Sequence, residues 1–295
     1  MQKLKEIPVV EFSAEVKKYF SFDIVPIKEI RDNRKKYKPD LELLHKLSFF
    51  NLMYVTNGTG QHYVDFDWYP IKENSLVFMS KEQLNAFDFS TDFNGFCLLF
   101  TEDFFIEIFS KVSKAFVFRL FNPQLFSPVV QVPSNADVLD YIKLFKKEYD
   151  KGCILNQKAV LNSLFTILLS KIEQNTSNEH KVLNNTGKSV LFQKFITLVE
   201  ANYMQQKQAL FYANKLAISY KYLNEVCKET VGKTAKTVID NFIVLQAKRN
   251  LANSNIKSSE LSYKLGFDDP TNFTKYFKKH TGLTPKAFKL SVLNN

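Results

Sequence analysis

The spacing of apolar residues changes along the chain, and each spacing predicts a different kind of element. Between residues 48 and 101, short β-rich runs are separated by turn residues, and residues 62–68 alternate between apolar and polar side chains. We expect a strand at each run, that is, at residues 49–55, 62–68, 75–79, 85–90 and 95–101. Asn57-Gly58 predicts a hairpin, Pro70 the end of a strand, and Glu73-Asn74 a further turn. Several short strands with regular turns predict a small barrel or a sandwich.

Helical patterns follow these strands. Residues 102–118 predict a helix, although their dense apolar content also allows a strand. Pro133-Ser134-Asn135 is a start signal for a helix over residues 136–151, and another helix is expected over residues 156–173. The last helix carries apolar residues on more than one face. One face can pack on the barrel, while the other either packs internally or meets a partner subunit.

The remaining segments divide the chain into domains. Residues 1–45 show little periodicity, so we interpret them as an arm with one or two short strands, and the basic cluster from Arg31 to Lys38 as a solvated loop. Residues 174–187 are polar and rich in Asn, Thr and Ser, which is typical of a linker. A helix over residues 188–205 then begins a second domain. We therefore expect one domain at residues 1–173 and another at residues 188–295.

Residues 260–289 predict a helix, a sharp turn and a second helix. Gly266 can leave the first helix at positive φ, Asp268 and Asp269 can accept hydrogen bonds from the amides that open the next helix, and Pro270 suits its first position. The second helix would bury Phe273, Tyr276 and Phe277. Its opposite, polar and basic face would carry Thr271, Thr274, Lys275 and Lys278. Such a unit can place its second helix in a DNA major groove.

The same unit occurs a second time. Leu216 and Leu265 lie 49 residues apart, whereas Leu223 and Phe273 lie 50 apart, so one residue is added at the later turn. The outward positions of the earlier copy are Tyr220, Lys221, Asn224 and Lys228. Glu225 on the same helix either accepts from a cytosine amino group or is a solvated residue paired with Lys221. Residues 238–252 predict a long helix that joins the two copies.

The run GFDDPTNFTKYFKKHTGLTP, residues 266–285, resembles the signature of AraC/XylS-type transcriptional regulators. The resemblance covers residues 188–292 closely. The order of strands and turns before it resembles the cupin-like domain that precedes the DNA-binding domain in many such regulators. The resemblance implies an α+β chain, with an N-terminal cupin-like β-barrel and flanking helices. Its C-terminal domain would be all-α, with two helix-turn-helix units joined by a long helix.

This resemblance also implies a function and its partners. We expect a sequence-specific transcription factor that binds double-stranded DNA, is controlled by a small-molecule effector or by dimerisation, and forms a homodimer. RNA polymerase is a further candidate partner. The expected DNA-binding residues are Tyr220, Lys221, Asn224, Lys228, Thr271, Thr274, Lys275 and Lys278. Lysine to guanine and asparagine to adenine are the natural base pairings, and Lys228 and Lys278 would contact phosphates.

The distribution of charge supports a polyanionic partner for the C-terminal half. From Lys188 onward there are 17 Lys and Arg against 7 Asp and Glu, a net charge of +10, while the first 187 residues are neutral with 23 of each. Phosphate neutralisation would make binding steeply dependent on salt. The alternative is a basic, soluble domain without this role. A non-specific architectural DNA binder is another, and it would bind scrambled sequences equally well.

Candidate catalytic and metal-binding groups are few. Cys97, Cys153 and Cys227 lack metal-ligand or disulfide spacing, and His45 and His62 form no paired ligand motif. We expect no metal and no cofactor, with His62 a packed strand residue rather than a ligand. A cupin-type enzyme remains the alternative, which stoichiometric iron, zinc or manganese would support. The absence of a leader or a long apolar stretch favours a cytoplasmic protein without a membrane span.

Aromatic residues are abundant in the first domain. They could line a pocket for a small organic molecule, since such sites are apolar with few polar anchors. The alternative is an ordinary barrel core, and the sequence names no individual pocket residue. The residues concerned are Phe50, Tyr54, Phe66, Trp68, Phe78, Phe87, Phe96 and Phe100.

Overall fold

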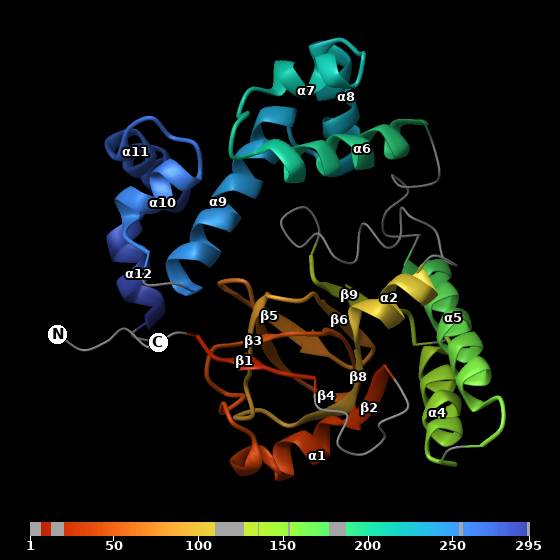
Figure 1. The fold of residues 1–295 in the computed structure, drawn as a ribbon. Helices are drawn as coiled ribbons and strands as arrows, with labels where there is room; N and C mark the ends of the chain where they lie inside the picture. The colour runs from red at the N-terminus through yellow and green to blue at the C-terminus, as the bar shows by residue number, and fades with distance from the viewer. Residues whose placement is uncertain are drawn as a thin grey trace. The chain divides into compact units, whose positions relative to one another are not determined.

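The chain folds into two compact units, Pro8–Lys181 and Val182–Asn295, which we call the barrel unit and the helical unit. Our computed structural model describes residues 7–12, 21–109, 127–134, 136–152, 154–176, 187–253 and 256–293. Figure 1 shows the elements of each unit. Most of the predicted linker, residues 177–186, lies outside the described residues, so the predicted domain limits at 173 and 188 stay predictions.

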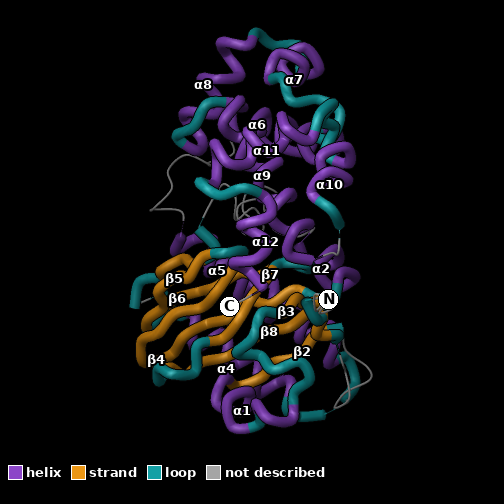
Figure 2. The backbone as a smooth tube through the Cα atoms, turned by 90° about the vertical axis from the view of Figure 1, so that its left-hand side faces the viewer, coloured by secondary structure: helices purple, strands orange, loops and turns teal. Residues whose placement is uncertain are grey.

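The barrel unit is a curled, mainly antiparallel sheet built around one long strand (Figure 2). That strand, β4, pairs antiparallel with β5, β6, β7 and β8, while β2 pairs with β8, β9 with β6, and β1 runs parallel to β3. The strands are β1 (Val9–Val10), β2 (Phe22–Pro26), β3 (His45–Leu47), β4 (Phe50–Val64), β5 (Asp67–Lys72), β6 (Ser75–Met79), β7 (Leu84–Phe87), β8 (Phe93–Phe100) and β9 (Val129–Gln131).

Alternation along β4 separates two cores. Leu52 and Tyr54 belong to the apolar cluster on the outer face of the sheet, whereas Met53 and Val55 belong to the cluster inside the barrel. Because successive strand side chains point to opposite faces, β4 supplies both clusters at once. This explains why its first half is buried at every position and shows no apolar-polar alternation.

Helices cover the outer face and one end of the barrel unit. Those of the outer face are α2 (Glu102–Phe109), α4 (Val138–Tyr149) and α5 (Gln157–Thr176), which confirms the predicted helices at 102, 136 and 156. Phe104, Phe145 and Phe165, one from each helix, lie in the same buried cluster. The rest of the predicted helix 102–118, beyond Phe109, lies outside the described residues.

Three predictions about the strands and turns of this unit are wrong, whereas the turn predicted at Glu73-Asn74 is confirmed between β5 and β6. Asn57-Gly58 forms no hairpin, because β4 passes through it with a bulge, and a Cβ on Gly58 would lie 2.2 Å from the Asp92 carbonyl oxygen. The hairpin instead turns at Asp65 and Phe66, both at positive φ, in the middle of the predicted strand 62–68. Pro70 does not end a strand, since it lies within β5 opposite Gln61, where it pairs with β4.

The predicted solvated loop from Arg31 to Lys38 is also wrong. It contains the end of helix α1 (Ile27–Asp32) and the 3-10 helix η1 (Arg34–Lys36). The Arg31 side chain is only 18% exposed, because its guanidinium donates to the Asp92 carboxylate at 2.7 Å and to the Phe93 carbonyl oxygen. A carboxylate 61 residues away therefore decides the place of this arginine.

The helical unit is built around α9 (Ala235–Asn253), which contacts most of the other helices described in this unit. Its buried residues, among them Ile239, Phe242 and Ile243, lie on all sides, because helices pack against it from several directions. The helices are α6 (Gly187–Asn202), α7 (Ala209–Lys215), α8 (Tyr220–Val231), α9 (Ala235–Asn253), α10 (Ser258–Lys264), α11 (Pro270–Thr281) and α12 (Pro285–Leu293). The predicted joining helix is confirmed. Within the described residues, no helix combines the length and apolar character needed to cross a membrane.

Candidate nucleic-acid interface

Two copies of one helix-turn-helix lie in the helical unit. The first copy is α7 with α8, and the second is α10 with α11. Both leading helices have seven residues and begin 49 apart, and both following helices have twelve residues and begin 50 apart. The internal repeat predicted from the sequence is therefore present in the backbone.

The two turns share one hydrogen-bond pattern. The Ala217 amide donates to the Asn214 carbonyl oxygen and the Ile218 amide to that of Ala213; the equivalent pairs in the second copy are Gly266 to Tyr263 and Phe267 to Ser262. Ala217 and Gly266 both have positive φ, at 54° and 68°. The inserted residue of the second copy is Asp268, since the register changes between it and the cap residue Asp269.

Capping fixes where α8 and α11 begin and end. The Ser219 hydroxyl accepts from the Tyr222 amide at 3.1 Å, and the Asp269 carboxylate accepts from the Thr271 amide at 2.6 Å and the Asn272 amide at 3.2 Å. Hydrogen bonds from Thr271 lower the pKa of Asp269, so this cap stays ionised at neutral pH. Left-handed glycines, Gly232 and Gly282, end the two helices.

The predicted outer faces of both helices are largely solvent-exposed. On α8, Tyr220, Lys221 and Lys228 are exposed, while Leu223, Val226 and Cys227 are buried as predicted. On α11 the exposed members are Thr271, Lys275 and Lys278, and the buried ones are Phe273 and Phe277. Each helix thus presents lysines and hydrogen-bonding side chains outward.

Two predicted base-reading residues have internal partners. The Asn224 side-chain oxygen accepts from the Ala235 amide at 3.0 Å, which satisfies the first turn of α9, and its amide nitrogen donates to the Tyr220 carbonyl oxygen at 3.2 Å. The Thr274 hydroxyl donates to the Pro270 carbonyl oxygen at 2.9 Å. Both side chains are half-buried, so they are less available to a groove than the lysines beside them.

Glu225 is paired, but not with the expected partner. Its carboxylate accepts from the Lys188 ammonium at 2.6 Å, and Lys188 also contacts Glu229 at 2.7 Å. These hydrogen bonds lower the pKa of Glu225. The predicted pairing with Lys221 is therefore corrected, because Lys188 on α6 reaches the carboxylate directly.

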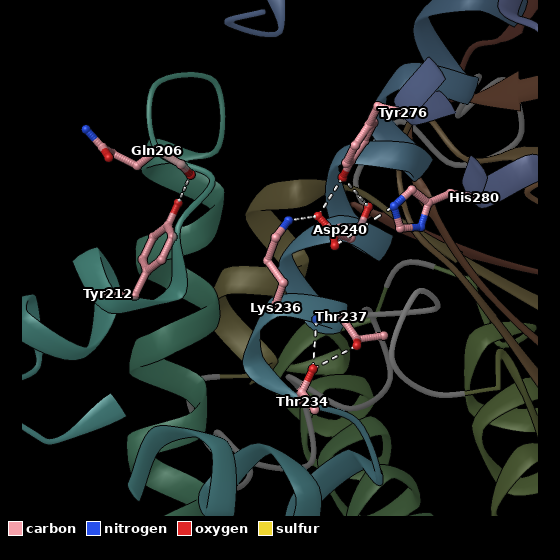
Figure 3. Close-up of polar contacts among 8 residues, drawn as sticks. All are labelled: Gln206, Tyr212, Thr234, Lys236, Thr237, Asp240, Tyr276 and His280. Atoms are coloured by element: carbon pink, nitrogen blue, oxygen red, sulfur yellow. Dashed lines mark hydrogen bonds and ion pairs between the residues drawn. The ribbon is translucent and has the colours of Figure 1, made fainter. Parts of the chain in front are cut away.

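The second copy is joined to α9 through Asp240. The Tyr276 hydroxyl donates to its carboxylate at 2.7 Å, the Lys236 ammonium contacts the same oxygen, and His280 lies 3.9 Å from the other (Figure 3). Burial, followed by the Asp240 charge, raises the pKa of Tyr276, so its phenol remains a donor. Asp240 is itself only 7% exposed. This buried, charged contact fixes the orientation of α11.

A second contact ties the two copies together. The segment between α6 and α7 lies against the turn of the second copy, where a Cβ on Gly266 would stand 1.6 Å from the Met204 carbonyl oxygen. The Lys207 ammonium donates to the Gly266 carbonyl oxygen and lies 4.6 Å from the centre of the Phe267 ring. The segment that leads into the first copy therefore also supports the turn of the second copy.

Sequence reasoning missed two exposed residues on these helices. Asn272 is exposed in the first turn of α11, and Tyr222 occupies the equivalent place on α8, 37% exposed. The 50-residue offset pairs them, so the repeat itself could have found them. Both lie beside the predicted reading positions.

The barrel unit contains a cavity of about 320 Å³. It is lined mostly by apolar side chains, with polar groups from several elements. The polar and charged lining residues are Glu11, Asp23, Glu29, Tyr37, His45, Asn51 and Asn85. His62 is fully buried in the barrel, and burial lowers its pKa to about 3, as a packed neutral strand residue requires. Among the described residues, no group of three or more potential ligands could hold a metal ion.

Comparison with known protein families gives separate matches in the barrel unit and in the helical unit. Residues 212–291 match a helix-turn-helix domain family, and residues 43–161 match the AraC-like ligand binding domain family. The transcriptional activator RhaS of Yersinia pestis is 22% identical over 252 residues, covering 83% of this chain and 88% of that protein. The Msm operon regulatory protein of Streptococcus mutans is 23% identical over 141 residues, and the match spans half of that protein's length. The crystal structure of ToxT from Vibrio cholerae covers 92% of this chain and 98% of its own, with 11% identity and a TM-score of 0.46.

Proposed function

The chain belongs to the AraC-type, DNA-binding transcriptional regulators with an N-terminal ligand-binding domain, and we propose that α8 and α11 read adjacent major-groove segments of one DNA site. Its activity is therefore regulation rather than catalysis.

The repeated unit carries this proposal. Two helices of equal length each have a side-chain N-cap and a C-terminal glycine, and the turns before them share equivalent hydrogen bonds. Both helices are held by α9 and by the contacts of Asp240 and Gly266. Two reading helices on one side of a duplex must be about one helical turn, roughly 34 Å, apart. A fixed spacing within one chain suits that requirement, because no dimer is needed to align two groove segments.

We assign base contacts to Lys221 on α8 and to Thr271 and Lys275 on α11. We assign phosphate contacts to Lys228 on α8 and Lys278 on α11. The lysines are exposed on the outward faces and can donate to guanine O6 and N7 or to phosphate oxygens. Tyr220 and Tyr222 are exposed beside these residues on α8, and Asn272 is exposed beside them on α11. We assign Asn224 to positioning α8 on α9, because its amide already bonds Tyr220 and Ala235. Thr274 supports the first turn of α11.

Hydroxyl-radical footprinting tests the assignment. The unaltered chain should protect two segments about 10 base pairs apart, and Lys221→Ala and Lys275→Ala should each weaken a different segment. Each change should cost about 1–3 kcal/mol of discrimination at one base pair. Lys194→Ala is the matched control, since Lys194 is an exposed lysine on α6, outside both candidate reading helices. Protection of a single segment, or equal loss on all sequences for both variants, would refute the proposal.

We further propose that the barrel unit forms a homodimer through α5. Val160 and Ile167 lie one heptad apart on this helix and are each 43% exposed, whereas Leu161 and Leu168 beside them are buried in the barrel unit. An exposed apolar stripe of this kind suits a partner helix. Val160→Glu combined with Ile167→Glu should shift the mass in light scattering from dimer to monomer. An unchanged mass would place the interface elsewhere.

The partners and location follow from the same proposal. A small-molecule effector in the barrel unit would bias the arrangement of the DNA-binding units, which it can do only through different affinities for the two arrangements. RNA polymerase is the further partner expected of a regulator. Because the target is chromosomal DNA, we infer a cytoplasmic location.

A further inference from the structure

The cavity of the barrel unit combines an apolar wall with polar and charged side chains. Its apolar wall includes Val25, Leu47, Phe87 and Leu99, which come from β2, β3, β7 and β8. Small-molecule sites combine such walls with a few polar atoms that select the ligand by their hydrogen-bonding character. The chemistry of those few atoms therefore indicates what the cavity accepts.

Asn51 presents an unused acceptor. It lies on β4, is 4% exposed, and lines the cavity, and its side-chain oxygen has no hydrogen-bond partner among the residues that the structure describes. Cys97 lines the same cavity, and burial raises the pKa of its thiol to about 12, which keeps it protonated. Buried polar atoms in native proteins are almost always satisfied. A donor on a bound molecule would satisfy this oxygen.

His45 adds a second acceptor. Its Nδ1 lies 2.9 Å from the Leu43 carbonyl oxygen, which can only accept, so Nδ1 carries the proton. Burial lowers the pKa of His45, so the ring is neutral and Nε2 is left as an acceptor. His45 is 1% exposed and lines the same cavity as Asn51.

Carboxylates make the cavity unfavourable for an anion. Asp23, Glu29 and the exposed Glu11 are among its lining residues. The pKa of Tyr37 is raised, first by burial and then by the charge of Glu29, with a smaller effect of Asp23, so both carboxylates act on the phenol at the cavity wall. A negatively charged group placed there would meet the same repulsion.

We propose that this cavity binds a small apolar molecule whose polar end donates hydrogen bonds and carries no negative charge, an alcohol or an amine. The inference rests on the proposed effector-controlled function and adds the chemical class of the effector. Asn51 and His45 accept from the donor, and the apolar wall holds the hydrocarbon part.

A matched probe series tests the class on the full chain. We would titrate 3-phenylpropanol, 3-phenylpropylamine and 3-phenylpropanoate by calorimetry, since they share one skeleton and differ in the polar end. The alcohol and the amine should bind about tenfold or more tighter than the carboxylate, a difference of the size that one unpaired buried group or one repelled charge produces. Tighter binding of the amine than of the alcohol would measure the contribution of the carboxylates.

Variants then locate the contact. Asn51→Leu should weaken the alcohol about tenfold. Gln61→Leu on the same strand is the control and should leave binding unchanged, because Gln61 bonds Asp88 and is not among the lining residues of this cavity. If Asn51→Leu does not fold, the order of the three probes on the unaltered chain still decides.

Three outcomes would overturn the inference. They are a carboxylate that binds as tightly as the alcohol, an Asn51→Leu chain that binds all probes as before, and no saturable binding by any probe at millimolar concentration. DNA footprints recorded on the same samples separate this failure from that of the proposed function. Intact double footprints alongside any of these outcomes would leave the DNA-binding proposal standing and remove only the effector class.

Discussion

At the scale of single residues, the two helix-turn-helix copies place different residues at one left-handed position of the turn. Ala217 and Gly266 occupy equivalent places in the turn, and both have positive φ. An L-residue with a Cβ is strained there by about 1–2 kcal/mol, whereas glycine is not. The first copy therefore tolerates strain that the second copy avoids, and in the second copy the Met204 carbonyl oxygen stands where a Cβ on Gly266 would lie.

Exchanging these residues should have opposite effects. Ala217→Gly should raise the stability of the helical unit by about 0.5–1 kcal/mol by relieving strain, after allowing for the greater freedom of unfolded glycine. Gly266→Ala should lower it by about 2 kcal/mol or more, because the added Cβ also meets Met204. The measurement is urea unfolding by circular dichroism, with Trp68 fluorescence identifying the barrel transition, since Trp68 is the one tryptophan in the sequence. Equal effects of the two exchanges would contradict this explanation.

His62 should make the barrel unit sensitive to acid. Its pKa is lowered by burial to about 3 in the folded chain, against 6.5 for an ordinary histidine. The unfolded state therefore binds the proton more readily, and stability falls as pH drops below about 6.5. At pH 5 the loss is about 2 kcal/mol from this residue, and the lowered pKa of His45 acts in the same direction. Unfolding followed by Trp68 fluorescence at pH 7 and pH 5 should show a smaller loss for His62→Leu, and an identical loss would count against the prediction.

At the scale of elements, helix α9 is the part on which both copies depend. Its first turn is bonded by Asn224 of α8, and its second turn carries Asp240, which holds Tyr276 of α11. One helix thus fixes the orientation of both candidate reading helices through polar contacts at its N-terminal end. The two orientations are coupled because they share this support.

Breaking the Asp240 contact should loosen α11 selectively. Asp240→Asn and Tyr276→Phe should each lower the stability of the helical unit by about 1–2 kcal/mol, and the double variant should cost about 1 kcal/mol less than the sum, since the residues share one hydrogen bond. In footprints, the segment contacted by α11 should weaken while that of α8 stays. Additive losses in unfolding experiments, or equal weakening of both segments, would argue against a selective contact.

At the scale of the whole molecule, the net charge and the proposed functions are divided between the two parts of the sequence. The excess of 10 positive charges lies from Lys188 onward, with the helix-turn-helix pair, while the first 187 residues are neutral. The helical unit can therefore bind a polyanion without electrostatic opposition from the rest of the sequence, and the barrel unit can carry a cavity with acidic groups. Each unit has the electrostatics that its proposed ligand needs.

This separation predicts how salt affects binding. The logarithm of the DNA association constant should fall linearly with the logarithm of salt concentration, and Lys228→Ala and Lys278→Ala should each reduce that slope by about 1 without changing sequence preference. Fluorescence anisotropy over a range of salt concentrations measures both quantities. Lys194→Ala again serves as the control, and a slope unchanged in the Lys228 and Lys278 variants would remove them from the phosphate contacts.

Local chemistry made much of this protein predictable from sequence. Helix caps such as Ser219 and Asp269, the terminal glycines, and the apolar spacing of α8 and α11 act within a few residues, so the sequence alone determined both copies, their offset, and the α+β division. What it could not determine were contacts between distant segments. Gly58 lies against the Asp92 backbone of another strand end, the partner of Glu225 is Lys188 on another helix, and the acceptor of Tyr276 lies 36 residues away.

The two candidate sites also differ in how far the sequence could predict them. The outward residues of the DNA-binding helices followed from helical spacing, because exposure on a helix repeats with its period. Asn224 and Thr274 were the exceptions. Asn224 bonds Ala235 of the next helix, and the Thr274 hydroxyl bonds the Pro270 carbonyl oxygen of its own helix. The cavity was not predictable, because its polar groups come from separate elements and only their packing brings Asn51 and His45 to the same cavity. The sequence determined the pair of helix-turn-helix units, and the tertiary structure decided how they are held and what the barrel can bind, because side-chain partners depend on which elements meet in space.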